Sequence, residues 1–140
     1  GGLDRDRCER FRAFGEALGR AYQVTDDLFD YIGDPARIGK GVRTDLPEGK
    51  VTLPLIRALA AAGPADRSRL QDIAARRSAL QPEDWRELLR IFEQTGAVEA
   101  CRQTARDLAA ESLEWLRDEP DGPARTALSR AVAYAVQRVH

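Results

Sequence analysis

Residues 15–30 read GEALGRAYQVTDDLFD, and this stretch is the most informative part of the chain. Its composition favours a helix, and no alternation typical of a strand interrupts it. Asp26 and Asp30 are four residues apart, so a helix places them on one face, a single turn apart. Asp27 lies about 100° further round the same turn. We therefore expect a helix whose C-terminal end carries an acidic cluster of three carboxylates.

The acidic cluster is unfavourable as a plain surface feature. Like charges at positions i and i+4 destabilise a helix by roughly 0.2–0.5 kcal/mol. The cluster also precedes Gly33, where the helix is expected to end and where its dipole disfavours anions. A divalent cation would remove both penalties, and ligands that are all oxygen suit Mg²⁺. A solvated acidic face is the plainer alternative.

The loop expected at residues 33–50 is rich in glycine and shows no helical periodicity. Long loops are more often functional than connective. Lys40 and Lys50 lie in it, and they are the only lysines among 22 basic residues. Because lysine is a compact point charge suited to a diphosphate, we predict that both bind phosphate, with ordinary loop lysines as the alternative. Asp45 and Glu48 are expected to be turn or capping residues.

The rest of the sequence predicts helices throughout, which makes the expected fold class all-α. Apolar periodicity and Gly/Pro punctuation place the helices at 4–32, 52–62, 65–78, 82–96 and 96–118, with a last one after the turn at 120–123. Thr52 is expected to be the N-cap of the second helix.

Composition narrows the functional classes. A net charge of −1 with interspersed signs argues against a nucleic-acid face, and no apolar run approaches the roughly 18 residues of a membrane span. No secretory signal is present, and two distant cysteines read as free thiols in a reducing cytosol, so a cytoplasmic location is expected. Because the sequence lacks Met, we expect that it was processed or cut from a longer chain.

A series of short motifs runs without a break over residues 15–54. They are Gly-x-x-x-Gly, Ala21-Tyr22-Gln23-x-x-Asp26-Asp27-x-x-Asp30, Gly33-Asp34-Pro35, Gly39-Lys40, Asp45-Leu46, Glu48-Gly49-Lys50 and Thr52-Leu53-Pro54. Their order and spacing resemble the second aspartate-rich region of the trans-polyprenyl diphosphate synthases. The remaining residues resemble the family weakly, and their ending is most similar to the bacterial long-chain branch.

The resemblance implies a helical bundle around a cavity, in which two aspartate-rich motifs hold Mg²⁺ ions on an allylic diphosphate. It implies that Asp26 is a direct metal ligand, with Asp27 and Asp30 acting nearby or through water. Lys40 would contact the leaving diphosphate, and Lys50 would assist.

Two further site residues come from the resemblance. Gln23 and Tyr22 would line the cavity near the reacting carbons or the isopentenyl group, although the family often has Phe where Tyr22 stands. Together with Asp26, Asp27 and Lys40, Gln23 is assigned to the catalytic set.

Residues 1–140 are accordingly expected to be a single partial domain, the C-terminal half of a prenyltransferase that condenses isopentenyl diphosphate with an allylic diphosphate. The first aspartate-rich motif and the basic residues that bind isopentenyl diphosphate are not found here; in the family they lie upstream of this region. We expect the chain alone to be inactive, to pair with the N-terminal half of the same enzyme, and to form homo-oligomers.

Three alternatives are open on the sequence alone. The chain could be a non-catalytic helical subunit that completes or regulates a partner synthase. It could be a helical interaction domain with an incidental acidic stripe. A terpene cyclase would share the bundle and the Mg²⁺ chemistry, but its second metal motif usually contains Asn and Ser or Thr, which are not seen.

Overall fold

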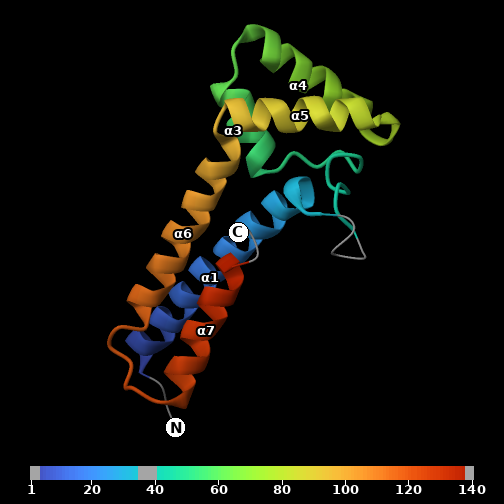
Figure 1. The fold of residues 1–140 in the computed structure, drawn as a ribbon. Coiled ribbons are helices and arrows are strands. Elements are labelled where there is room, and N and C mark those ends of the chain that lie inside the picture. The colour runs from blue at the N-terminus through green and yellow to red at the C-terminus, as the bar shows by residue number, and fades with distance from the viewer. Residues whose placement is uncertain (1–3, 35–40, 138–140) are drawn as a thin grey trace. The chain divides into compact units, whose positions relative to one another are not determined.

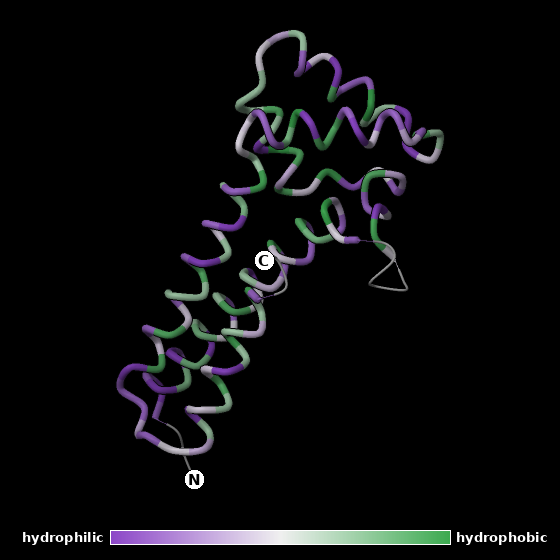
Figure 2. The backbone as a smooth tube through the Cα atoms, viewed as in Figure 1, coloured by the Kyte–Doolittle hydropathy of each residue, from purple (hydrophilic) through white to green (hydrophobic). Residues whose placement is uncertain are grey.

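The computed structural model describes residues 4–34 and 41–137, and within these ranges it contains helices and no strand. The helices are α1 (Arg5–Ile32), α3 (Leu53–Ala61), α4 (Pro64–Arg76), a 3₁₀ turn at Arg77–Ala79, α5 (Pro82–Gln94), α6 (Ala97–Trp115) and α7 (Pro123–Gln137) (Figure 1). The predicted all-α class is confirmed, and each expected helix is present with ends shifted by a few residues. Hydrophilic and hydrophobic residues alternate along the helices, as amphipathic packing requires (Figure 2).

The chain divides into two compact units. One contains the residues up to Thr25 together with those from Arg102 onward, and the other is Asp26–Cys101. Each unit has a hydrophobic cluster of its own.

In the first unit, residues of α1, α6 and α7 pack on one another. The buried members of this cluster are Phe14, Ala109, Leu116 and Val132. The buried carboxylate of Glu119, in the turn before α7, accepts hydrogen bonds from Arg7 of α1 at 2.6–3.2 Å. Paired burial of this kind lets a carboxylate leave water without remaining unsatisfied.

In the second unit, α3, α4 and α5 enclose the larger cluster, and the end of α1 contributes to it. Tyr31 of α1 is fully buried and contacts the rings of Trp85 and Phe92, with centroids 6.2 and 5.1 Å apart. Burial raises the pKa of the Tyr31 phenol to about 12. The last turns of α1 are therefore fixed against the core of this unit by a residue adjacent to Asp30.

The start of α5 is held by a buried carboxylate. Asp84 accepts a hydrogen bond from the backbone N–H of Gln81 and further bonds from Arg76 and Arg69 at 2.8–3.1 Å. The Gln81 N–H, followed by the two arginines, holds the pKa of Asp84 below its usual range. These contacts tie α4 and α5 together.

Thr52 is the N-cap residue of α3, as predicted. Its side chain, however, makes no capping hydrogen bond. A cap oxygen bonds the N–H of the second or third helical residue, and the second residue here is Pro54, which has no N–H. The N–H of Leu55, the third helical residue, is the donor that remains at this helix end.

Candidate functional site

The acidic cluster lies on the last two turns of α1, and its three carboxylates have different environments. Asp26 is exposed, Asp27 is half-buried, and Asp30 is only 6% exposed. Asp26 and Asp27 present oxygen donors at or near the surface, whereas Asp30 belongs to the interior of the second unit.

Asp30 binds the loop that follows the helix. Its carboxylate accepts hydrogen bonds from the backbone N–H of Thr44 at 3.0 Å, the Thr44 hydroxyl at 2.9 Å and the backbone N–H of Asp45 at 3.1 Å. Its backbone carbonyl accepts a fourth, from the N–H of Arg43 at 2.7 Å. Three consecutive loop residues therefore dock on one residue of α1.

The loop then forms a turn that ends at Lys50. The backbone N–H of Lys50 donates to the carbonyl of Asp45 at 2.9 Å, and Gly49 takes a left-handed conformation (φ 82°) to close the turn. The Lys50 ammonium lies 2.7 Å from Glu48 and 3.0 Å from Asp45. Hydrogen bonds to Glu48 and then to Asp45 raise the pKa of Lys50, and both carboxylates pair with the ammonium group of this side chain, which is more than half exposed.

Arg43 also lies in this loop, and no motif in the sequence marks it as a site residue. It takes a left-handed conformation (φ 63°), which is uncommon for a residue other than glycine. Its guanidinium lies over the ring of Trp85 at 5.3 Å, a cation–π contact. Within the described part of the chain, its Nε atom is buried without a hydrogen-bond partner.

The other predicted site residues are placed as follows. Tyr22 and Gln23 are exposed on α1, in the first unit. Lys40 lies outside the described residues. Asp45 and Glu48, expected as turn or capping residues, do lie in the turn, and their carboxylates bind Lys50. The short spacing of Asp45 and Glu48 from Lys50 in the sequence could have indicated this pairing.

The donor set of α1 fits a metal that is shared with a ligand. Among the described residues, no group of three or more His, Cys, Asp or Glu side chains could hold a metal ion alone. Mg²⁺ is commonly bound through one or two carboxylates, with waters and substrate phosphates completing its shell. Asp26 and Asp27 could supply such carboxylates. The Asp30 oxygens accept hydrogen bonds from the loop.

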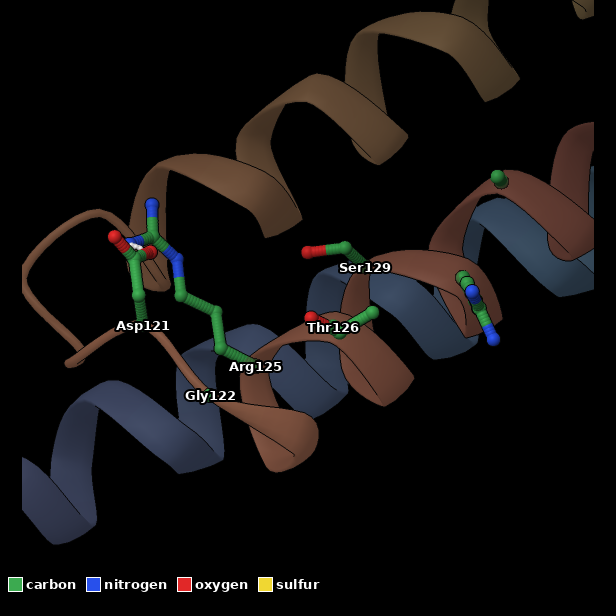
Figure 3. A pocket seen from close by; sticks show the side chains of 7 residues that line it. Asp121, Gly122, Arg125, Thr126 and Ser129 are labelled. Atoms are coloured by element: carbon green, nitrogen blue, oxygen red, sulfur yellow. Dashed lines mark hydrogen bonds and ion pairs between the residues drawn. The ribbon is translucent and has the colours of Figure 1, made fainter.

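A shallow hollow lies on α7 and the turn before it, in the first unit, and several polar residues line it. Its lining includes Asp121, Arg125, Thr126 and Ser129 (Figure 3). The Arg125 guanidinium binds the Asp121 carboxylate at 2.6 Å and the carbonyl of Glu119 at 3.1 Å. This arginine is thus used to stabilise the turn before α7, and the hollow contains none of the predicted site residues.

Comparison with known proteins assigns the family. A sequence model of the polyprenyl synthetase family matches residues 1–92. The chain belongs to this family. The resemblance predicted from the motifs of residues 15–54 is therefore confirmed.

Individual polyprenyl synthases agree with the assignment. Octaprenyl diphosphate synthase of Escherichia coli K12 is 36% identical over 129 residues, which cover 89% of this chain and 38% of that protein. The match to this enzyme agrees with the predicted similarity to the bacterial long-chain branch.

Solved structures of the family share the fold. The polyprenyl synthase of Caulobacter crescentus CB15, solved with calcium and isoprenyl diphosphate, is 33% identical with a TM-score of 0.87, over 99% of this chain and 42% of that one. A geranylgeranyl pyrophosphate synthase from Corynebacterium glutamicum, solved with isoprenyl diphosphate and magnesium, is 28% identical with a TM-score of 0.82, over 93% and 37%. The chain thus spans about two fifths of the length of the synthases it matches.

No helix in residues 4–34 or 41–137 is both long enough and apolar enough to cross a membrane.

Proposed function

We propose that this chain is the C-terminal, Mg²⁺-diphosphate-binding part of a prenyltransferase that condenses isopentenyl diphosphate with an allylic diphosphate. The observation that carries the proposal is the arrangement at the end of α1. Asp26 and Asp27 lie on the same helix end as Asp30, which anchors the turn that carries Lys50. Family membership and the span of about two fifths of the relatives support it.

The reaction begins when the allylic carbon–oxygen bond breaks, so negative charge grows on the departing diphosphate. Mg²⁺, when bound, supplies positive charge to these oxygens. Asp26 would hold the metal directly, and Asp27 would act beside it or through water. Preorganised charge of this kind acts most strongly where the charge develops.

The cationic side chains of the loop act on the same diphosphate. Lys40 would contact the leaving group, and Lys50, fixed by Asp45 and Glu48, would add positive charge from a defined position. Tyr22 and Gln23 are assigned to the cavity near the reacting carbons on the resemblance alone.

The two units would together form the C-terminal part of one synthase domain. The sequence contains one Asp-Asp-x-x-Asp pattern, so a second carboxylate set and the isopentenyl diphosphate site would come from the N-terminal part of the enzyme. The chain alone would therefore bind a diphosphate without condensing it.

Titration calorimetry with Mg²⁺, in the presence and absence of pyrophosphate, tests this proposal. We expect Mg²⁺ binding to be much tighter with pyrophosphate, because the ligand supplies oxygens that Asp26 and Asp27 lack. Asp26→Ala should weaken that binding by at least about tenfold, through loss of a charged ligand.

The matched control is Asp72→Ala, which removes an exposed carboxylate of α4 in the same unit. It should bind as the wild type does. Equal Mg²⁺ affinity of the wild type and Asp26→Ala would refute the proposed site. Mg²⁺ affinity that does not change when pyrophosphate is added would indicate that the acidic cluster is only a solvated helix end.

A further inference from the structure

We infer that Asp30, the third carboxylate of the acidic cluster, is a positioning residue: it locks the loop at 43–50 to the end of α1 and thereby sets Lys50 relative to the other two carboxylates. The inference rests on the proposed function, since it concerns how the diphosphate site is assembled. It assigns Asp30 a role different from that of Asp26 and Asp27, which are the proposed metal ligands.

The hydrogen bonds of Asp30 leave its carboxylate little capacity for a metal. An ionised carboxylate has about four acceptor positions on its two oxygens. Here Oδ1 accepts from the N–H and the hydroxyl of Thr44, and Oδ2 accepts from the N–H of Asp45, with a longer contact of 3.2 Å to the Thr44 N–H. Hydrogen bonds to an ionised acceptor are about twice as strong as neutral ones, and this side chain is only 6% exposed. A metal ion at either oxygen would compete with these bonds.

The same bonds connect α1 to the cation of the loop in a short chain of contacts. Asp30 holds the backbone of Asp45, and the carboxylate of Asp45 holds the ammonium of Lys50 at 3.0 Å. The backbone closes the same path, because the N–H of Lys50 donates to the carbonyl of Asp45. All of these residues belong to the second unit, so the path lies within one compact body.

Arg43 shows that tertiary contacts impose the conformation of this loop. A left-handed conformation is unfavourable in free energy for any residue that has a Cβ atom, so the chain would not adopt it without other contacts. Two contacts hold it there: the Arg43 N–H bonds the carbonyl of Asp30, and the guanidinium stacks on Trp85. The loop thus contacts both α1 and α5, and Asp30 accepts the hydrogen bonds from Arg43, Thr44 and Asp45.

The test uses the 140-residue chain with Mg²⁺ and inorganic pyrophosphate. Asp30→Asn keeps the shape of the side chain, removes its charge and directs an NH₂ group at one of the loop donors. We expect pyrophosphate affinity at saturating Mg²⁺ to fall by about three- to tenfold. The Mg²⁺ concentration for half-saturation at saturating pyrophosphate should stay unchanged, whereas Asp26→Asn should raise it.

Thr44→Val is a second variant that weakens the same anchor from the side of the loop. It removes one donor to Asp30, has nearly the same shape, and leaves every carboxylate in place. It should also lower pyrophosphate affinity, but by a smaller factor than Asp30→Asn does. In the double variant Asp30→Asn/Lys50→Ala the two losses should be less than additive, because Asp30 acts through Lys50. A purely structural role, which only lowers the folded fraction, would not produce that coupling.

Amide hydrogen exchange separates this inference from the proposed function. The Thr44 and Asp45 amides should be protected in the wild type and lose protection in Asp30→Asn. Retained protection, or a rise in the Mg²⁺ half-saturation as large as that of Asp26→Asn, would overturn the inference. If the wild type fails to bind magnesium pyrophosphate at all, the proposed function is overturned, and the exchange result alone decides whether Asp30 anchors the loop.

Discussion

The purified 140-residue chain should show no measurable condensation of isopentenyl diphosphate with an allylic diphosphate. The sequence carries a single Asp-Asp-x-x-Asp pattern, so the leaving diphosphate would be neutralised from one side only. If the isopentenyl diphosphate site lies in the N-terminal part of the enzyme, as proposed, the reaction also loses the proximity term, which can reach roughly 7–11 kcal/mol. These losses together exceed what binding of one substrate could offset.

A radiolabelled isopentenyl diphosphate assay measures this directly. The chain is assayed alone and with a separately expressed N-terminal portion of a polyprenyl synthase, after mass spectrometry has excluded full-length enzyme from the host. Turnover should require the added portion. Turnover by the chain alone would mean that its active site is complete and that the proposal of a partial site is wrong.

We expect Lys40→Ala to lower kcat/KM by about ten- to a hundredfold when the chain is assayed together with the N-terminal portion, because a charge-assisted contact to the leaving diphosphate is lost. Lys40→Arg should restore only part of the rate, since a planar fork replaces a point charge. Steady-state kinetics at saturating Mg²⁺ provide the measurement.

Lys50 provides a second variant, at a position that the structure describes. Lys50 is already paired with Glu48 and Asp45, so its charge is shared before a ligand arrives. Lys50→Ala should cost less than Lys40→Ala, because the resemblance assigns Lys50 only an assisting role. An unchanged kcat/KM in Lys40→Ala, or a larger loss in Lys50→Ala, would indicate that Lys50 rather than Lys40 contacts the leaving diphosphate.

The helices could be predicted from the sequence because local signals agree with the fold. Glycine and proline mark most ends: Gly33 follows α1, and Pro64, Pro82 and Pro123 begin α4, α5 and α7. Thr52 occupies the predicted N-cap position of α3, although its side chain makes no capping hydrogen bond. The division into two units could not be predicted, because both α1 and α6 continue across its boundaries as unbroken helices.

The candidate site could be predicted only in part. The spacing of Asp26, Asp27 and Asp30 indicated that they share a helix end, but not that Asp30 turns inward. That depends on the backbone N–H groups of Thr44 and Asp45, which any residue type except proline would present. The stacking of Arg43 on Trp85 joins residues 42 positions apart and has no local signature.

The most direct test of the central claim is paramagnetic broadening by Mn²⁺, which accepts the same oxygen ligands as Mg²⁺. NMR spectra of the labelled chain would be recorded with Mn²⁺, with and without pyrophosphate. The account predicts that the amide signals around Asp26 and Asp27 broaden first, that this requires pyrophosphate, and that Asp26→Asn abolishes it. Broadening first at the acids of α6 or α7, or broadening around Asp26 that persists in Asp26→Asn, would contradict the claim that this helix end binds the metal diphosphate.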